Sequence, residues 1–164
     1  MIKPLLASAT VALMLVTPAF ADGKIYVALP DLSGVTGAAA ETMLREVVLA
    51  NVISSNCADF SVTDEEWSLL TDSADILAHE QLKLSTDAYD SKYYDPAFDA
   101  LDQADACATE GPNVQPVIEQ LVALGGSRTA LPDQEAAYHA MQARQAQWDA
   151  LEASPAPSGK TKQK

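Results

Sequence analysis

Two histidines, His79 and His139, are the side chains best suited to proton transfer or metal binding, and each stands alone in the sequence. His79 is followed by Glu80 but by no second histidine four residues on, so the zinc-protease pattern is absent. A joint metal site would require the helices that carry His79 and His139 to meet. Carboxylate pairs are abundant in so acidic a chain, and Ser127 lies in no G-x-S-x-G nucleophile elbow. We therefore predict that the protein is not an enzyme and that it holds no metal and no cofactor.

Three tyrosines lie close together among the acidic residues of segment 87–95: Tyr89, Tyr93 and Tyr94. The spacing of the acids in this segment does not match an EF-hand loop, so it does not predict a calcium site. Tyrosine is enriched at protein interfaces, and these three would form a protein-binding patch. The alternative is that they fill the core and its rim.

Two cysteines, Cys57 and Cys107, are the only thiols of the chain. They form no C-x-x-C motif, which speaks against a redox enzyme and against a c-type haem site. In an oxidising compartment such a pair is expected to form a structural disulfide. Closing a loop of about 50 residues would stabilise the fold by about 4 kcal/mol in the chain-entropy view.

The two ends of the chain carry signals of a different kind. Residues 1–21 combine Lys3, an apolar run too short to span a bilayer, and the small-residue site Ala19-Phe20-Ala21. This pattern predicts a signal peptide cleaved after Ala21, with an uncleaved anchor as the alternative, and an exported protein, periplasmic or else secreted. Residues 154–164 are rich in Pro, Ser, Gly and Lys and are predicted to be a disordered basic tail.

Charge narrows the classes of partner. The chain has 23 acidic and 10 basic residues and a net charge of −13. Such a surface repels phosphates, so we expect neither nucleic acid nor an anionic membrane as partner. No second apolar stretch is long enough for a membrane span after the leader is removed. A basic protein or a cation would suit the acidic segment 57–110, although a merely well-solvated face would give the same composition.

Apolar spacing and capping signals predict five helices in residues 22–153, which we take to be one domain. They cover about 37–56, 63–84, 95–110, 113–124 and 132–151, after an extended N-terminal arm. The second helix begins with a capping box of Thr63 and Glu66. We expect Trp67, Phe98 and Val122 on the buried faces of their helices. The predicted fold is all-α, a small bundle of four to five helices stapled by one disulfide.

The last of these helices has a thin apolar stripe that includes Met141 and Trp148. These two residues would dock a partner protein or a second copy of the chain, or else pack on the bundle itself. The sequence does not determine the oligomeric state.

The stretch from Cys57 to Glu65 reads C-x-D-F-x-x-x-D-E. It resembles the segment around the first cysteine of the HdeA-type periplasmic acid-stress chaperones. The resemblance implies a small exported helical protein in which Cys57 and Cys107 form the family's disulfide, and which binds unfolded client proteins in acid. The chain departs from that family in the long apolar helix before Cys57 and in the length that follows Cys107.

Two functions follow as hypotheses. The first is an exported, non-catalytic protein that binds other proteins, such as a periplasmic inhibitor, an immunity protein or a structural partner. The second is an acid-stress chaperone, in which protonation of the carboxylates below pH ~4 would reverse the net charge and loosen the fold.

Overall fold

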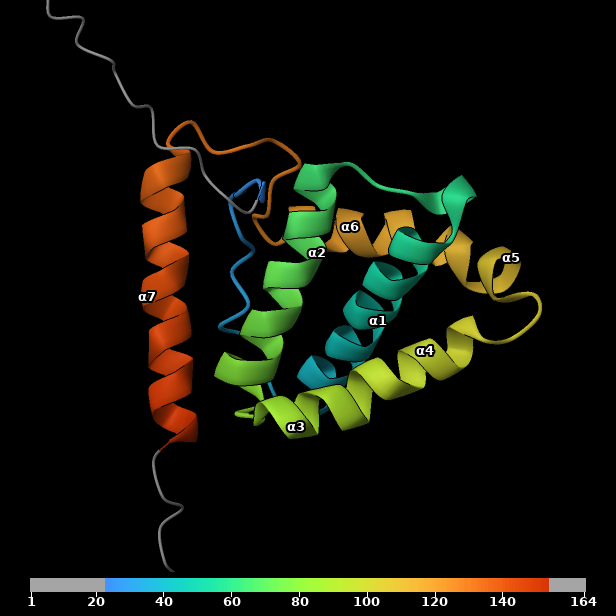
Figure 1. The fold of residues 1–164 in the computed structure, drawn as a ribbon, viewed down its shortest axis with the longest axis horizontal. Helices are drawn as coiled ribbons and strands as arrows, with labels where there is room; N and C mark the ends of the chain where they lie inside the picture. The colour runs from blue at the N-terminus through green and yellow to red at the C-terminus, as the bar shows by residue number, and fades with distance from the viewer. Residues whose placement is uncertain (1–22, 154–164) are drawn as a thin grey trace, which may run out of the picture.

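The computed structural model describes residues 23–153 and is all-α, as the sequence predicts (Figure 1). The predicted signal peptide (1–21) and basic tail (154–164) lie outside the described residues. Apart from the short 3-10 turn η1 (Ala58–Phe60), the helical segments of residues 23–153 join into five continuous rods, which form a bundle stapled by the disulfide. None of the helices within residues 23–153 is both long and apolar enough to cross a membrane.

Helix α1 (Gly37–Asn56) is the central element of the bundle, with α2, α4 and α6 around it (Figure 1). Apolar residues occupy more than one stripe of this helix, so it can be covered on several sides. Leu44, Val48 and Ile53 are completely buried. This burial explains why the helix needs no side-chain cap at its N-cap residue, Thr36.

Helix α2 (Asp64–Ile76) begins with the predicted capping box, which is confirmed. The Glu66 amide donates to the Thr63 hydroxyl, and the Thr63 amide donates to the Glu66 carboxylate, each at 3.2 Å. Glu66 turns inward and also meets Arg128 at 3.4 Å. With Glu66 on the inner face of the helix, Leu70 and Ala74, four and eight residues further on, also lie in the core. Trp67 is 39% exposed, so the prediction that Trp67 is buried was wrong. The helix continues as a π-helical turn, η2 (Leu77–Gln81).

The third rod begins nine residues earlier than predicted. Ser85 caps α3 (Thr86–Tyr89), and a π-helical turn, η3 (Asp90–Tyr94), leads directly into α4 (Asp95–Leu101). In η3 the Asp95 amide donates to the Asp90 carbonyl, five residues back. Such a wide turn accommodates Pro96, which has no amide hydrogen to donate and would crowd the carbonyl of an ordinary helical turn.

The prediction that Phe98 is buried was wrong. The apolar spacing was assigned to one helix over 95–110, whereas α4 ends at Leu101 and an exposed turn follows at 102–105. In α4 Ala97 faces the core, and Phe98 is 49% exposed, stacked on Tyr94 with 6.4 Å between ring centroids.

The fourth rod consists of α5 (Ala106–Glu110), a 3-10 turn η4 (Gly111–Asn113) and α6 (Val114–Ala123). It packs against α1 with Val114, Ile118 and Leu121 buried. Val122 lies at the edge of this stripe and is 37% exposed, contrary to the prediction. The chain then leaves the helix at Gly125, whose φ of +102° suits glycine.

The last rod, α7 (Gln134–Glu152), runs alongside α2 at the edge of the molecule (Figure 1). Within α7 only Trp148 is buried. The N-terminal arm passes between the helices and is tied to the segment before α7 by one β-bridge, Val27 to Ala130. The Gln134 side chain accepts a hydrogen bond from the Tyr26 amide at 2.8 Å and donates one to the Tyr26 carbonyl at 2.9 Å. These two bonds fix the start of α7 against the arm.

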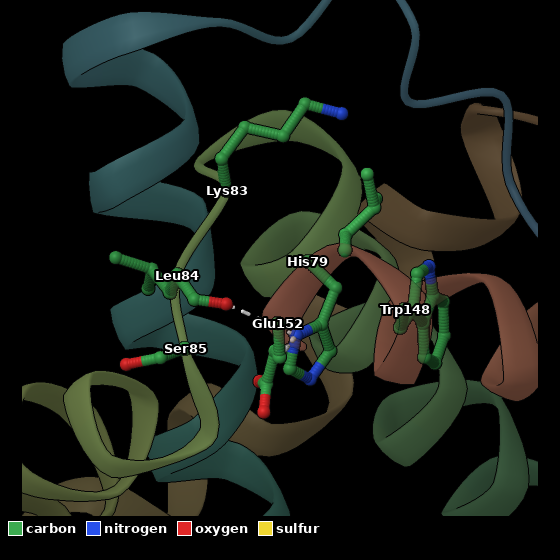
Figure 2. A pocket seen from close by; sticks show the side chains of 7 residues that line it. His79, Lys83, Leu84, Ser85, Trp148 and Glu152 are labelled. Carbon is green, nitrogen blue, oxygen red and sulfur yellow. Dashed lines mark hydrogen bonds and ion pairs between the residues drawn. The ribbon is translucent and has the colours of Figure 1, made fainter. Parts of the chain in front are cut away.

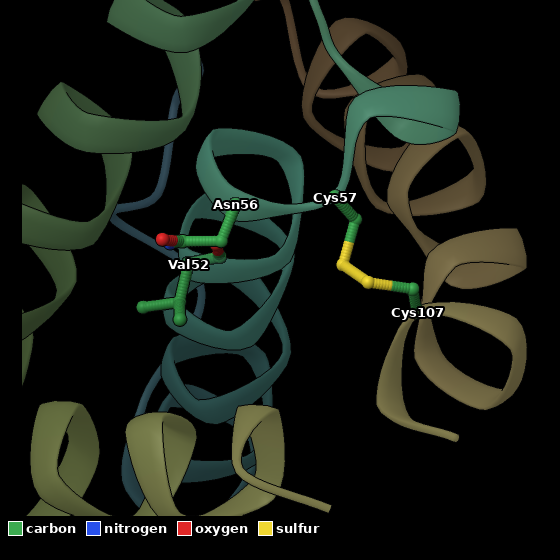
Figure 3. The surroundings of a disulfide bond; sticks show 4 residues. All are labelled: Val52, Asn56, Cys57 and Cys107. Carbon is green, nitrogen blue, oxygen red and sulfur yellow. A yellow bond between two sulfur atoms is a disulfide. The ribbon is translucent and has the colours of Figure 1, made fainter. Parts of the chain in front are cut away.

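The predicted disulfide is confirmed. Cys57 follows the last residue of α1 and bonds to Cys107 in α5, with 5.6 Å between the two Cα atoms (Figure 3). Asn56 donates from its side-chain amide to the Val52 carbonyl at 2.7 Å and so secures the last turn of α1 beside the bridge. The bond therefore joins the end of the central helix to the start of the fourth rod.

Candidate functional site

The most elaborate side-chain cluster of the molecule surrounds His79, which lies in the π turn η2. Its imidazole is stacked on Trp148 of α7, with centroids 5.0 Å apart, and meets the edge of Tyr89 of α3 at 5.7 Å. Figure 2 shows His79 between Trp148 and the chain segment of Leu84 and Ser85. Aromatic contacts of this kind add about 0.5–1.5 kcal/mol beyond burial. Because Trp148 is the buried residue of α7, this cluster anchors that helix.

Hydrogen bonding fixes the orientation of the His79 ring. Nδ1 lies 3.2 Å from the Leu84 carbonyl oxygen, which can only accept, so in the neutral ring Nδ1 carries the hydrogen. The Glu152 carboxylate is 4.0 Å from the same nitrogen. Glu152 also accepts from the amide and the hydroxyl of Thr86, at 2.7 and 2.9 Å. The end of α7 is thereby tied to the start of α3.

Asp75 lies one helical turn before His79 and is only partly exposed. Burial, followed by the negative charge of Asp72, raises the pKa of the Asp75 carboxyl to about 6. The polar groups that face the buried hydroxyl of Tyr89 are the Asp75 carboxylate and the Tyr94 hydroxyl, and neither meets it in regular hydrogen-bond geometry. Burial raises the pKa of Tyr89 well above its usual range, so Tyr89 stays neutral.

Two ion pairs extend the cluster along α2. Lys24 of the arm bonds to the buried carboxylate of Asp72, and Arg144 of α7 meets Glu80 at 3.5 Å. Burial raises the pKa of Asp72 in spite of the opposing effect of Lys24. The Lys24–Asp72 pair is largely buried and the Arg144–Glu80 pair is half-exposed, and pairs of either kind contribute little net stability. They align the arm, α2 and α7.

A cavity of about 350 Å3 opens beside His79, lined also by Lys83, Ser85, Trp148 and Glu152 (Figure 2). No serine or threonine hydroxyl in the described part of the chain is hydrogen-bonded to His79. The Ser85 hydroxyl accepts from the Ala88 amide as an N-cap. Among residues 23–153, no group of three or more potential ligands could hold a metal ion. The cluster therefore positions α7, and within the described residues it places no nucleophile in hydrogen-bond contact with His79.

The residues proposed from sequence to bind a partner are mostly internal. Tyr89, Tyr93 and Trp148 are only 4%, 6% and 4% exposed, so none of them can contact a partner in this conformation. Tyr94 and Met141 are partly buried and pack against the core. The structure places Tyr89 and Trp148 against His79, and Tyr94 packs on Tyr89 with 5.2 Å between ring centroids.

Tyr93 and Met141 do not contact His79, although Tyr93 packs on Tyr89 with 6.4 Å between ring centroids. Tyr93 faces α1, within the electrostatic influence of Glu41 and Arg45. Met141 lines a smaller cavity of about 130 Å3 between α7 and the arm. His139 is exposed beside Tyr138, so the structure gives no sign of a joint site with His79.

A second site, which the sequence reasoning missed, is a groove between α1 and the α5–η4–α6 rod. We call it the α1/α6 groove. It has a volume of about 370 Å3 and is lined by eight residues, from Glu46, Leu49 and Ala50 on α1 to Glu110, Asn113, Pro116, Val117 and Gln120 on the facing rod. Its only sequence signal is the pair of apolar positions Leu49 and Val117, which look like ordinary core positions until the two helices are placed.

Comparison with known proteins adds no relative to this description: no family model, no curated protein and no solved structure matches the chain. The function must therefore be argued from the chemistry of the two sites.

Proposed function

We propose that this chain is an exported, non-catalytic protein that binds a basic partner protein. The observation that carries the proposal is the excess of carboxylates without a cation. All but one of the 23 acidic residues lie in the described part of the chain, with only six of the ten basic residues. Three carboxylates there meet a lysine or arginine within 4.0 Å, namely Asp72, Glu66 and Glu80, and Glu152 lies 4.0 Å from His79. Most of the other carboxylates are exposed and available to a partner.

The partner is a protein because the same charge repels nucleic acids and anionic lipid. Like-charge repulsion also discourages acidic proteins, and the field accelerates encounters with basic ones. The disulfide between Cys57 and Cys107 is typical of chains that work in an oxidising compartment, which supports the predicted periplasmic location.

Asp75 argues for this proposal over the acid-stress chaperone. A chaperone that loosens in acid needs carboxylates that stabilise the fold as anions. The pKa of Asp75 is instead raised to about 6 and that of Asp72 is also raised. Both groups therefore favour the folded state more as the pH decreases.

The test has two steps. The oxidised chain without residues 1–21 is immobilised, proteins of the matching exported fraction are captured, and each is purified and titrated calorimetrically at about 150 mM salt. The proposal expects a saturable 1:1 complex with a basic protein, whose affinity decreases as salt increases. The proposal would be refuted if no captured protein binds more tightly than about 10 μM, or if the bound proteins are acidic.

The acid-chaperone hypothesis has its own readout in the same preparation. Suppressed aggregation of a client protein near pH 3, with loss of near-UV circular dichroism and gain of dye binding, would replace the proposal.

A further inference from the structure

We infer that the α1/α6 groove is the surface that receives the partner, and that the partner supplies an amphipathic segment with apolar side chains flanked by lysine or arginine. This inference rests on the proposed function and names the site and the chemistry of its partner. It commits to a second protein as the occupant because the charge around the groove suits a basic segment.

The floor of the groove is apolar. Leu49 and Ala50 form one side, and Pro116 and Val117 form the other. Leu49 is partly exposed and Pro116 is exposed, so apolar surface is open to solvent at this place. A volume of about 370 Å3 lies within the range of about 300–1,000 Å3 in which protein pockets hold ligands. Burial of this floor would give a partner segment its non-polar contact.

The rim of the groove is acidic and unpaired. Glu46 is exposed on α1, and Glu110 is partly buried at the end of α5. The Asn113 amide donates to Glu110 at 3.4 Å, and neither carboxylate takes part in an ion pair within the described residues. No lysine or arginine of that part lines the groove. Arg45, the neighbour of Glu46 in sequence, instead acts on Tyr93.

The walls of the groove are held in place before any partner arrives. The disulfide connects Cys57, after the end of α1, to Cys107, one helical turn before Glu110 (Figure 3). The opposite wall is a continuous helical rod from α5 through η4 to α6. A preformed groove spares a partner much of the cost of ordering its receptor.

The cavity beside His79 is a weaker candidate for the same role. Lys83 lines it and would repel a basic segment. Its carboxylate, Glu152, already accepts two hydrogen bonds from Thr86. The residues that line this cavity, among them His79, Trp148 and Glu152, hold α7 on the bundle.

The test uses calorimetry with a helical peptide of about 18 residues as the probe, with leucines at i, i+3, i+4 and i+7 and lysines elsewhere. Its counterpart has glutamate in place of lysine. The double variant E46Q/E110Q removes the rim charges, and Leu49→Arg fills the groove with a cation. The matched control is E119Q/E135Q, which removes two exposed carboxylates that do not line the groove.

We expect the lysine peptide to bind and the glutamate peptide not to bind. E46Q/E110Q should weaken binding about tenfold at low salt, since each variant side chain loses one exposed, salt-screened ion pair with the peptide. Leu49→Arg should abolish binding, and E119Q/E135Q should change it less than about twofold. Near-UV circular dichroism of each variant checks that the fold is unchanged, and amide chemical shifts should move in 46–50 and 110–120.

The outcomes separate this inference from the proposed function. Equal weakening by E46Q/E110Q and by the control, or shifts centred elsewhere, overturns the groove as the site. If the captured partner still binds the groove variants as tightly as wild type, the groove is wrong and the proposed function stands. If neither the lysine peptide nor any captured basic protein binds, both are overturned.

Discussion

Replacing the Asp75 carboxylate by an amide of the same shape should stabilise the protein at neutral pH. The pKa of Asp75 is raised from its usual value of 3.8 to about 6, chiefly because burial disfavours its charge and secondly because Asp72 is negative. This difference in pKa corresponds to about 3 kcal/mol. Asp75 is only partly buried, and solvent screening reduces this figure. We therefore expect Asp75→Asn to add about 1–2 kcal/mol to the free energy of unfolding at pH 7.5.

The pH dependence gives the prediction its sign. Above pH 7 the Asp75 carboxyl is charged in both the folded and the unfolded chain, and the folded chain is destabilised by the full cost of burying this charge. As the pH falls through about 6 the folded chain binds a proton, while the unfolded chain does so only near its value of 3.8. The free energy of unfolding of the wild type therefore increases as the pH falls from about 6 to about 4. Below pH 4 Asp75 contributes no further change, because it is protonated in both states.

Urea unfolding of wild type and Asp75→Asn at pH 7.5 and pH 4.5, followed by near-UV circular dichroism, measures both effects. The gain in the variant should be present at pH 7.5 and mostly absent at pH 4.5. Asp99→Asn, at an exposed position of α4, should show neither effect. A variant that is less stable than wild type at pH 7.5, or an equal gain at both pH values, would refute the argument from burial.

Three further predictions address the framework. A Cβ on Gly111 would lie 2.2 Å from the Phe60 ring, so Gly111→Ala should lower the free energy of unfolding by about 1–3 kcal/mol, as measured by urea unfolding. Gly34→Ala is the control and should leave the stability unchanged, because nothing lies within 4 Å of a Cβ at that position. Trp148→Ala should make the amide hydrogens of α7 exchange much faster while those of α1 stay protected, because Trp148 is the buried anchor of α7; equal acceleration in both helices would contradict this. Replacing Cys57 and Cys107 together by serine should lower stability by about 4 kcal/mol, and a loss below about 1 kcal/mol would show that the bridge constrains little.

The parts of the fold that could be predicted are those governed by neighbours in sequence. The capping box at Thr63 and the glycine stop at Gly125 depend on side chains and φ angles within one turn, and both occur as expected. The bounds of α1, residues 37–56, follow from its long apolar pattern.

The errors have two physical origins. The apolar spacing after residue 95 was assigned to one helix, but the chain turns at 102–105, so the face containing Phe98 was misplaced. Trp67 was misplaced because Glu66, a charged residue, takes the inward position. Neither event leaves a clear mark in the composition of its segment.

The candidate sites could be predicted only in part. The sequence drew attention to Tyr89 and Trp148 by residue type but could not show that both would be buried against His79. The α1/α6 groove depends on how Leu49 and Val117 approach each other from helices far apart in the chain. Such a site is a property of tertiary packing and has no local motif.

The position of the disulfide has a consequence for survival among proteases. Residues 102–105 form an exposed turn between α4 and α5, where a protease could cut. That turn lies inside the covalent ring closed by Cys57 and Cys107. A chain severed there would stay in one piece, since its two fragments are still linked through sulfur, and α1 would keep its connection to α5 and α6. The nick would become visible only on a reducing gel.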